Sequence, residues 1–360
     1  MLKTVCVWLL ALCSANFAWA QAPAASTKKI KYEALEQSSG LATYKGQPFS
    51  GRAFEMWPNN RIYREIGYEN GLRHGEYFEY NEQSALMAHE TWVRGQKNGA
   101  YDYHYPDGAL KSRGTFTRDE LDGLIEGFYA FGGKQYEVNY ALGVRHGWSV
   151  TYYEIGAREQ ETYFDNGLPH GEVVAYYKDS TYRYIRDYEH GMQQGRNYVA
   201  HRSGCPGIEE YYKKGQLDSV RRTFDPVLCS LLEEGWYTQG QKDGSFYTFG
   251  FFGDTLTVAT YEKGVLNGPY RIAKEHWDAE KLKNVWDIEE QGQYVSGELD
   301  GHWKHGFVSH YQQREGSYEL GTMVGEWKLY DAEGYLLATQ WYDNQGELIK
   351  QKFHKRKKRS

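Results

Sequence analysis

Four histidines are the side chains that first suggest metal chemistry in this chain, because imidazole is the commonest protein ligand of transition metals. His74, His146 and His170 each stand directly before a glycine, at positions that Asn and Asp fill elsewhere, and His190 is the fourth. His74 and His146 are 72 residues apart, and His146 and His170 are 24 apart. We expect such separations to place them on different structural units, too far apart to share one ion with bonds of about 2 Å. We therefore interpret these histidines as turn residues.

A local histidine cluster is the better metal-ligating candidate. His302, His305 and His310 lie within one short segment, although we assign no metal to it. Paired carboxylates could in principle do acid–base work, and they occur at Asp119, Glu120, Asp122, Glu289 and Glu290. Their places in expected turns and at strand starts favour solvated surface over catalysis.

Recognisable catalytic motifs are missing from the sequence. It has no Gly-x-Ser-x-Gly elbow, no phosphate-binding Gly-x-x-x-x-Gly-Lys and no Cys/His set with metal spacing. We predict a protein that is not an enzyme and needs no cofactor. The enzyme-class alternative is a hydrolase that uses carboxylates near residues 274–288.

Aromatic residues are the other candidates for function, since the chain holds 33 Tyr and 11 Trp. Several recur two places after a glycine, namely Tyr77, Tyr101, Phe246, Tyr270, Trp303 and Trp327. Such rows either pack on one another as a substitute for an aliphatic core or remain exposed to bind a partner or sugar rings. We name Tyr77, Tyr101, Trp303 and Trp327 as partner-binding candidates. Trp277 and Trp286 are the stronger candidates, because a thin sheet cannot bury two Trp in a charged segment.

These residues lie in a repeat whose period is about 24 residues. An aromatic residue is followed three places later by a glycine and four places after that by a second glycine, as in Tyr68–Gly71–Gly75 and Tyr318–Gly321–Gly325. A fixed period of this length indicates stacked units that bury their apolar sides only against neighbours. The sequence therefore predicts one elongated array, from residue 44 to 349.

Turn signals divide each unit into two strands. Asn, Asp or His often precedes the second glycine, and such pairs favour tight hairpins because both residues adopt positive φ. A second turn signal falls half a period later, as at Pro106-Asp107-Gly108. Two strands of about eight residues remain per unit, so we predict an all-β fold of stacked antiparallel hairpins.

Two segments depart from the repeat. Residues 274–288 are an insertion, which we expect to form a protruding loop or short helix. Ser219 replaces the second glycine of its unit, and we interpret that unit as a bend in the array.

The ends of the chain differ in composition from the repeats. Residues 1–20 combine a basic start, an apolar stretch and Ala18-Trp19-Ala20, which is typical of a cleaved secretory signal peptide. Leu12 is too large for a lipoprotein signal at Cys13. We expect residues 21–43 to be a flexible leader and residues 350–360 to be a basic, disordered tail. The protein is thus predicted to be exported, to the periplasm or beyond.

Cys205 and Cys229 are the cysteines that remain after the signal peptide, one repeat apart. An oxidising compartment favours a disulfide between them. Equivalent positions in successive hairpins are about 9–10 Å apart, beyond the ~7 Å limit for bonded Cα atoms. Both cysteines lie beside prolines in turns that can lean together, so a disulfide and two free thiols both remain open.

The tandem Tyr-x-x-Gly-x-x-x-Gly units, such as Tyr68-Glu-Asn-Gly-Leu-Arg-His-Gly, resemble the MORN-repeat variant family over residues 44–345. These bacterial repeat proteins are often labelled as an antitoxin component. The resemblance implies stacked β-hairpins, a role in protein–protein or membrane-proximal association, and no catalytic residues. An exported chain would not meet a cytosolic toxin, so we do not carry that label over.

From these features we predict a non-enzymatic exported scaffold that binds a protein partner through an aromatic-rich β surface. The alternative is a module that binds cell-envelope glycan. The formal net charge of −6 does not favour nucleic acid as a partner, whereas the basic tail could touch anionic surfaces.

Overall fold

The computed structural model describes residues 28–38, 40–278, 283–306 and 313–355, with the side chains of 275–286 outside the description. The chain forms two compact units, Met1–Asn98 and Gly99–Ser360. In the described residues the one helix is a three-residue 3-10 turn, η1 (Tyr32–Ala34), and the rest of the regular structure is strand. The all-β prediction is confirmed.

Unit 1 contains a short antiparallel meander and a small second sheet. Its strands are β1 (Lys29–Lys31), β2 (Glu36–Ser38), β3 (Leu41–Tyr44), β4 (Gln47–Pro48), β5 (Gly51–Met56), β6 (Ile62–Glu69), β7 (Leu72–Tyr80), β8 (Leu86–Val93) and the start of β9 (Gln96–His104). Strands β5 to β8 pair antiparallel in chain order, and β1 lies parallel to β5. Strands β2, β3 and β4 form the second sheet.

The expected leader is wrong for residues 28–38 and 40–43, which are folded in unit 1. Leu35 and Ala42 are buried in one apolar cluster with Phe49, Ile66 and Tyr77. The Ala42 N–H also donates to the Gly71 carbonyl over 2.7 Å. Burial of these side chains fixes a segment whose composition alone suggested flexibility.

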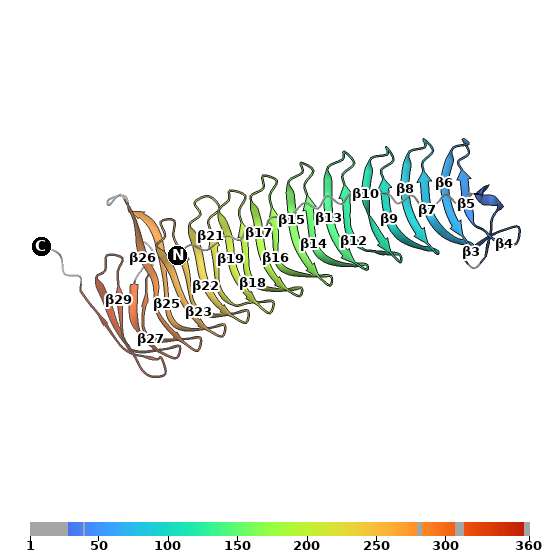
Figure 1. Ribbon diagram of the computed structural model, residues 1–360. Helices are drawn as coiled ribbons and strands as arrows, with labels where there is room; N and C mark the ends of the chain where they lie inside the picture. The colour runs from blue at the N-terminus through green and yellow to red at the C-terminus, as the bar shows by residue number, and fades with distance from the viewer. Residues whose placement is uncertain (1–27, 39, 279–282, 307–312, 356–360) are drawn as a thin grey trace, which may run out of the picture. The chain divides into compact units, whose positions relative to one another are not determined.

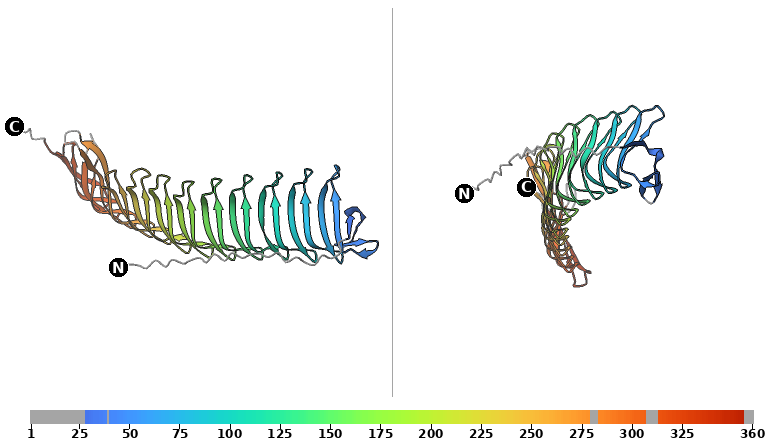
Figure 2. Two further views of the ribbon diagram at one scale, coloured as in Figure 1. Left: turned by 45° about the horizontal axis from the view of Figure 1, so that its top comes forward. Right: turned by 45° about the vertical axis from the view of Figure 1, so that its right-hand side comes forward.

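Unit 2 is a long antiparallel meander in which each strand pairs with its chain neighbours (Figure 1). Its further strands are β10 (Leu110–Thr117), β11 (Glu120–Leu121), β12 (Gly123–Phe128), β13 (Lys134–Ala141), β14 (Val144–Tyr152), β15 (Arg158–Asp165), β16 (Leu168–Tyr176), β17 (Tyr182–Glu189), β18 (Met192–Ala200), β19 (Pro206–Lys213), β20 (Gln216–Leu217), β21 (Ser219–Phe224), β22 (Leu231–Thr238), β23 (Gln241–Phe249), β24 (Thr255–Glu262), β25 (Val265–Asp278), β26 (Lys283–Val295), β27 (Glu298–His305), β28 (Gln313–Glu319), β29 (Thr322–Tyr330), β30 (Leu336–Tyr342) and β31 (Leu348–Phe353). Figure 2 shows these strands bent along their length, from green to red.

The tight turns are at the first glycine of each repeat, not at the second as predicted. The residue before the first glycine has φ between 43° and 51° at Asn70, Arg94, Leu142, Asn166, His190, Lys214, Gln239, Lys263, Ser296 and Leu320. Two successive positive-φ residues match the twist of the flanking strands. Arg, Leu and Lys, which are not typical turn residues, occupy this position in several repeats. Residue type therefore did not reveal the turn.

The second glycine lies inside a strand, at a β-bulge. Gly171, for example, has φ 76° within β16, and the pairing of β15 with β16 shifts between Thr162 and Phe164. Ser219 takes the same role with φ 87°, and β19 and β22 pair with β21 on either side of it. The sheet therefore runs through the unit in which we expected a bend.

The half-period turns are confirmed as five-residue loops, with one six-residue loop at 225–230. In the loop 153–157, for instance, the Tyr153 N–H donates to the Ala157 carbonyl and the Gly156 N–H to the Tyr153 carbonyl, both over 2.8 Å. We call this side of unit 2 the loop edge, formed by the connections 105–109, 129–133, 153–157, 177–181, 201–205, 225–230 and 250–254. The opposite side, with the two-residue turns, is the turn edge.

The insertion and the tail are both extended. Strands β25 and β26 pair from Gly268 and Tyr294 to Asp278 and Lys283, so the insertion is a lengthened β-hairpin rather than a helix or loop. The start of the expected tail forms β31, which pairs with β30, and residues 356–360 lie outside the described residues, as do residues 1–27.

Candidate functional site

Four of the predicted partner-binding aromatics belong to the core. Trp303 and Trp327 are fully buried, and Tyr77 and Tyr101 are 8% and 5% exposed. Their rings pack on neighbouring rings, as in Tyr318 against Trp327 with centroids 5.0 Å apart. The prediction that these four bind a partner is therefore wrong, because a buried ring cannot contact a partner. They are core residues.

The other two candidates, Trp277 and Trp286, lie on the lengthened hairpin. Trp277 is in register with Asn284 and Trp286 with Glu275, and their side chains are outside the described residues.

The buried indoles depend on glycines of the preceding strand. A Cβ added to Gly292 would lie 2.2 Å from the Trp303 ring, and one added to Gly316 would lie 2.2 Å from the Trp327 ring. Each indole Nε1 also donates to a backbone carbonyl, that of Gln293 over 3.0 Å and that of Ser317 over 3.2 Å. The sequence contained a signal for this packing. Gly292 and Gly316 each stand two places before the aromatic residue of a repeat, and in both repeats the residue two places after the second glycine is a tryptophan.

His305 lies between the two indoles. Its ring stacks on Trp303 at 5.5 Å and on Trp327 at 6.1 Å, and the Tyr318 hydroxyl lies 3.2 Å from Nε2. Burial, with the positive charge of Arg314, lowers the pKa of His305 below its ordinary 6.5, and nearby Glu290 opposes this only in part. This imidazole is thus held neutral near pH 7.

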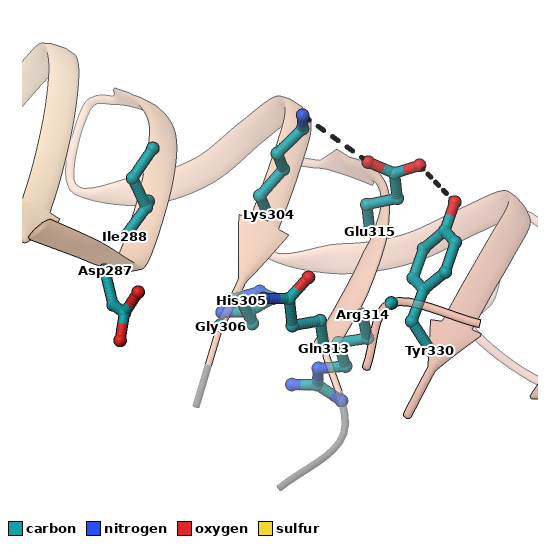
Figure 3. Close-up of a pocket in the computed structure, with 10 residues that line it drawn as sticks. Asp287, Ile288, Lys304, His305, Gly306, Gln313, Arg314, Glu315 and Tyr330 are labelled. Carbon is teal, nitrogen blue, oxygen red and sulfur yellow. Dashed lines mark hydrogen bonds and ion pairs between the residues drawn. The ribbon is translucent and has the colours of Figure 1, made fainter. Parts of the chain in front are cut away.

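A pocket of about 440 Å³ opens beside His305, lined by strands β26, β27 and β28 and by the end of β29 (Figure 3). Glu315 crosses its rim, where it accepts a hydrogen bond from the Tyr330 hydroxyl over 2.7 Å and pairs with Lys304 at 3.7 Å. The Tyr330 hydrogen bond, followed by the charge of Lys304, lowers the pKa of Glu315. Burial and this same carboxylate raise the pKa of Tyr330 to about 12. The Glu315 carboxylate therefore already has hydrogen-bond and ion-pair partners within the protein.

The histidines do not form a metal centre in the described part of the chain, where no group of three or more His, Cys, Asp or Glu side chains is placed to hold an ion. His302 and His305 contact different carboxylates, Glu315 at 3.9 Å and Glu290 at 3.8 Å, and His310 lies outside the described residues.

Two of the dispersed histidines are closer together than their sequence spacing suggested. The rings of His170 and His190 are 4.9 Å apart, and Asp165 contacts both His146 and His190, at 3.5 and 3.7 Å. Of the four, His190 is a turn residue with φ 45°.

Exposed apolar side chains lie on both edges of unit 2, and the most exposed of them are mainly on the loop edge. Phe131, Ile155, Val227, Phe251 and Phe252 are between 64% and 80% exposed, and we call them the loop-edge patch. Phe131 and Ile155 lie on consecutive loops, as do Val227 and the two phenylalanines. Successive loops are two strands apart, about 9.6 Å. The patch thus presents two apolar groups separated by polar loops.

A ladder of side-chain hydrogen bonds positions these loops. The tyrosine at the start of a loop donates its hydroxyl to a backbone carbonyl of the next hairpin, 23 residues later: Tyr105 to Phe128, Tyr129 to Tyr152, Tyr153 to Tyr176 and Tyr177 to Ala200, over 2.7–3.0 Å. In the next loop His201 Nε2 lies 3.2 Å from the Phe224 carbonyl. Phe131 and Ile155 therefore project from loops that the ladder holds, whereas the loops of Val227, Phe251 and Phe252 begin with Asp225 and Gly250 in place of the tyrosine.

A disulfide joins two loops of this edge. Cys205 and Cys229 are bonded, with Cα atoms 5.0 Å apart. The distance expected from strand spacing was too long because Cys229, at φ 56°, lies in a six-residue loop that leans toward its neighbour. The bond ties loop 201–205 to the loop that carries Val227.

The described residues include no helix long and apolar enough to cross a membrane. No known protein family and no curated protein matches the chain. A solved structure of the Photorhabdus luminescens Tc holotoxin pore aligns at 9% identity and TM-score 0.13, over 87% of this chain and 24% of that one. The TcdB2–TccC3 structure aligns at 9% identity and TM-score 0.10, over 88% of this chain and 24% of that one. The chain spans about a quarter of both, and such TM-scores support no conclusion about function.

Proposed function

We propose that this chain is a MORN-like, non-enzymatic, exported scaffold that binds another protein through the loop-edge patch. The observation that carries the proposal is the exposure of five large apolar side chains at loop tips, of which Phe131 and Ile155 lie on loops held by the tyrosine ladder. Neighbouring exposed apolar side chains, such as Phe251 and Phe252, are typical of interaction sites, and loops held by hydrogen bonds lose little conformational entropy on binding.

Export is proposed from the composition of residues 1–20 and agrees with the Cys205–Cys229 disulfide, which persists in oxidising compartments. A partner would then be another protein of the cell envelope or the exterior.

The proposal is tested by crosslinked capture from an envelope extract. Wild type should enrich a discrete protein, and Phe251→Ser with Phe252→Ser should lose it. Leu168→Ser with Met192→Ser is the matched control, since it removes two exposed apolar side chains from the turn edge. Equal loss in both variants, or capture that neither affects, contradicts a role for the patch.

Glycan binding is the second candidate, and one observation favours it. Trp148 on β14 is 54% exposed and packs edge-on against Tyr163 at 5.6 Å, an arrangement on which a sugar ring could stack. Pelleting with purified peptidoglycan that is lost in Trp148→Ala would support this candidate over the first.

A further inference from the structure

Strand β31 is an edge strand of unit 2. It pairs with β30 on one side, and no described strand of unit 2 pairs with its other side. All six of its residues are exposed. An unpaired edge offers a row of backbone donors and acceptors to an added strand.

The register shows which backbone groups of β31 face outward. The His354 N–H donates to the Leu337 carbonyl, and in an antiparallel pair hydrogen-bonded positions alternate. Lys352 and Lys350 therefore bond to β30, opposite Thr339 and Trp341. The N–H and C=O groups of Gln351 and Phe353 point away from β30, whereas Ile349 is the extra residue at a β-bulge opposite Trp341 and Tyr342.

Beyond this bulge, the apolar and the basic side chains of β31 lie on different faces of the strand. Ile349 is 67% exposed and Phe353 76% exposed, and Phe353 lies on one face with Gln351. Lys350 and Lys352 lie on the other face, since successive residues alternate. An edge that only prevented pairing would not need two large apolar side chains in solvent.

Charge argues against a second copy of this chain as the occupant. An antiparallel β31–β31 pair centred on Gln351 would place Lys350 opposite Lys352, and like charges in that position are destabilising. Strand β1 of a second copy would bring Lys29 and Lys31. Residues 348–360 contain seven Lys or Arg and no Asp or Glu, so the edge suits an acidic partner.

We propose that β31 is a β-augmentation site for an extended segment of a partner protein in which acidic and apolar residues alternate. Its carboxylates face Lys350 and Lys352, and its apolar side chains cover Phe353. Backbone hydrogen bonds form at Gln351 and Phe353. The inference refines the proposed function by giving a protein partner a second contact surface.

The test is fluorescence anisotropy with a labelled hexapeptide of alternating Val and Glu, and a matched Val/Lys peptide. Wild type should bind the Val/Glu peptide and not the Val/Lys peptide. Gln351→Pro removes one outward N–H and leaves the bonds to β30, so binding should weaken at least about tenfold. Gln351→Val is the control, because it loses the same amide side chain but keeps the N–H. Lys350→Glu with Lys352→Glu should reverse the preference between the peptides.

Unfolding midpoints of the variants establish that β31 remains folded. If wild type fails to bind the Val/Glu peptide, or if Gln351→Pro binds it as well as Gln351→Val, the inference is wrong. Its failure is distinguishable from that of the proposed function. Capture that depends on Phe251 and Phe252 but is unchanged in Gln351→Pro leaves the scaffold proposal standing and overturns the edge-strand site.

Discussion

The Asp243 carboxylate accepts a hydrogen bond from the backbone N–H of Lys263, 3.2 Å away and twenty residues later in the chain. Lys263 is the first residue of the next two-residue turn. The same relation joins Asp122 to Leu142, His146 to Asn166, His170 to His190, Gln194 to Lys214, Asn267 to Ser296 and Asp300 to Leu320. These hairpins of unit 2 thus each help to hold the turn of the next one.

Removing this acceptor should loosen one turn. In Asp243→Ala the Lys263 N–H loses its partner, at a cost of about 1 kcal/mol. Amide exchange at Lys263 should then accelerate about fivefold. Asp243→Asn should behave as wild type, because Asn267 makes the same bond at its own position. Unchanged exchange in the Ala variant would show that the bond does not couple the hairpins.

The glycines beneath the indoles should tolerate no side chain. In Gly316→Ala the new Cβ would lie 2.2 Å from the Trp327 ring, so the indole must leave its position. We expect a loss of about 1–3 kcal/mol in unfolding free energy, comparable to overpacking a core. Gly133→Ala is the control, since its closest contact is the exposed Phe131 ring at 3.1 Å. Urea unfolding followed by tryptophan fluorescence measures both, and equal midpoints would contradict the packing argument.

The repeat period was enough to predict the fold, because stacked hairpins impose the same local rules on every unit. The sequence did not reveal which glycine makes the turn. Asp and His before Gly244 and Gly171 look like turn formers, yet they act through side-chain acceptors, while Lys263 and Leu142 take the positive φ. A short polar side chain suits both roles, so residue type could not separate them.

The exposed aromatic surface was harder to predict because exposure depends on which ring packs against a neighbouring strand. Trp303 is buried because Gly292 leaves room beneath it, whereas Phe251 is exposed because it lies at a loop tip, where only the Phe252 ring packs against it. Both are bulky aromatic residues. The difference in their exposure follows from the pairing register of the strands, which cannot be inferred from one residue at a time.

The disulfide should stabilise the loop edge. Closing a loop over a sequence separation of 24 residues contributes about 3 kcal/mol in the chain-entropy view. Cys205→Ser with Cys229→Ser should therefore lower the unfolding midpoint, and a reductant should lower the wild-type midpoint to that of the variant. A wild-type protein insensitive to reductant would contradict this expectation. Capture of a partner by loops 201–205 and 225–230 should weaken with it.

Acidification should destabilise the hairpins around His305 before it titrates the carboxylates. The folded pKa of His305 is below its ordinary 6.5, so between these two values the unfolded chain binds more protons. Stability then rises with pH across this window, and it is lost as pH falls from about 6.5 toward the folded pKa. Exchange of the β27 and β29 amides should accelerate over this range in wild type.

His305→Gln separates this effect from others, because glutamine does not titrate and its amide can still meet the Tyr318 hydroxyl. The difference in stability between wild type and variant should change with pH below about 6.5 and be constant above about 7.5. Glu315→Gln is the complementary variant. The lowered pKa of Glu315 makes its contribution fall only as pH drops below its ordinary 4.5. If amide exchange in β27 of the wild type follows that of His305→Gln at every pH, the prediction is wrong. The stacked imidazole would then be protonated as readily in the folded chain as in the unfolded one, contrary to its burial between two indoles.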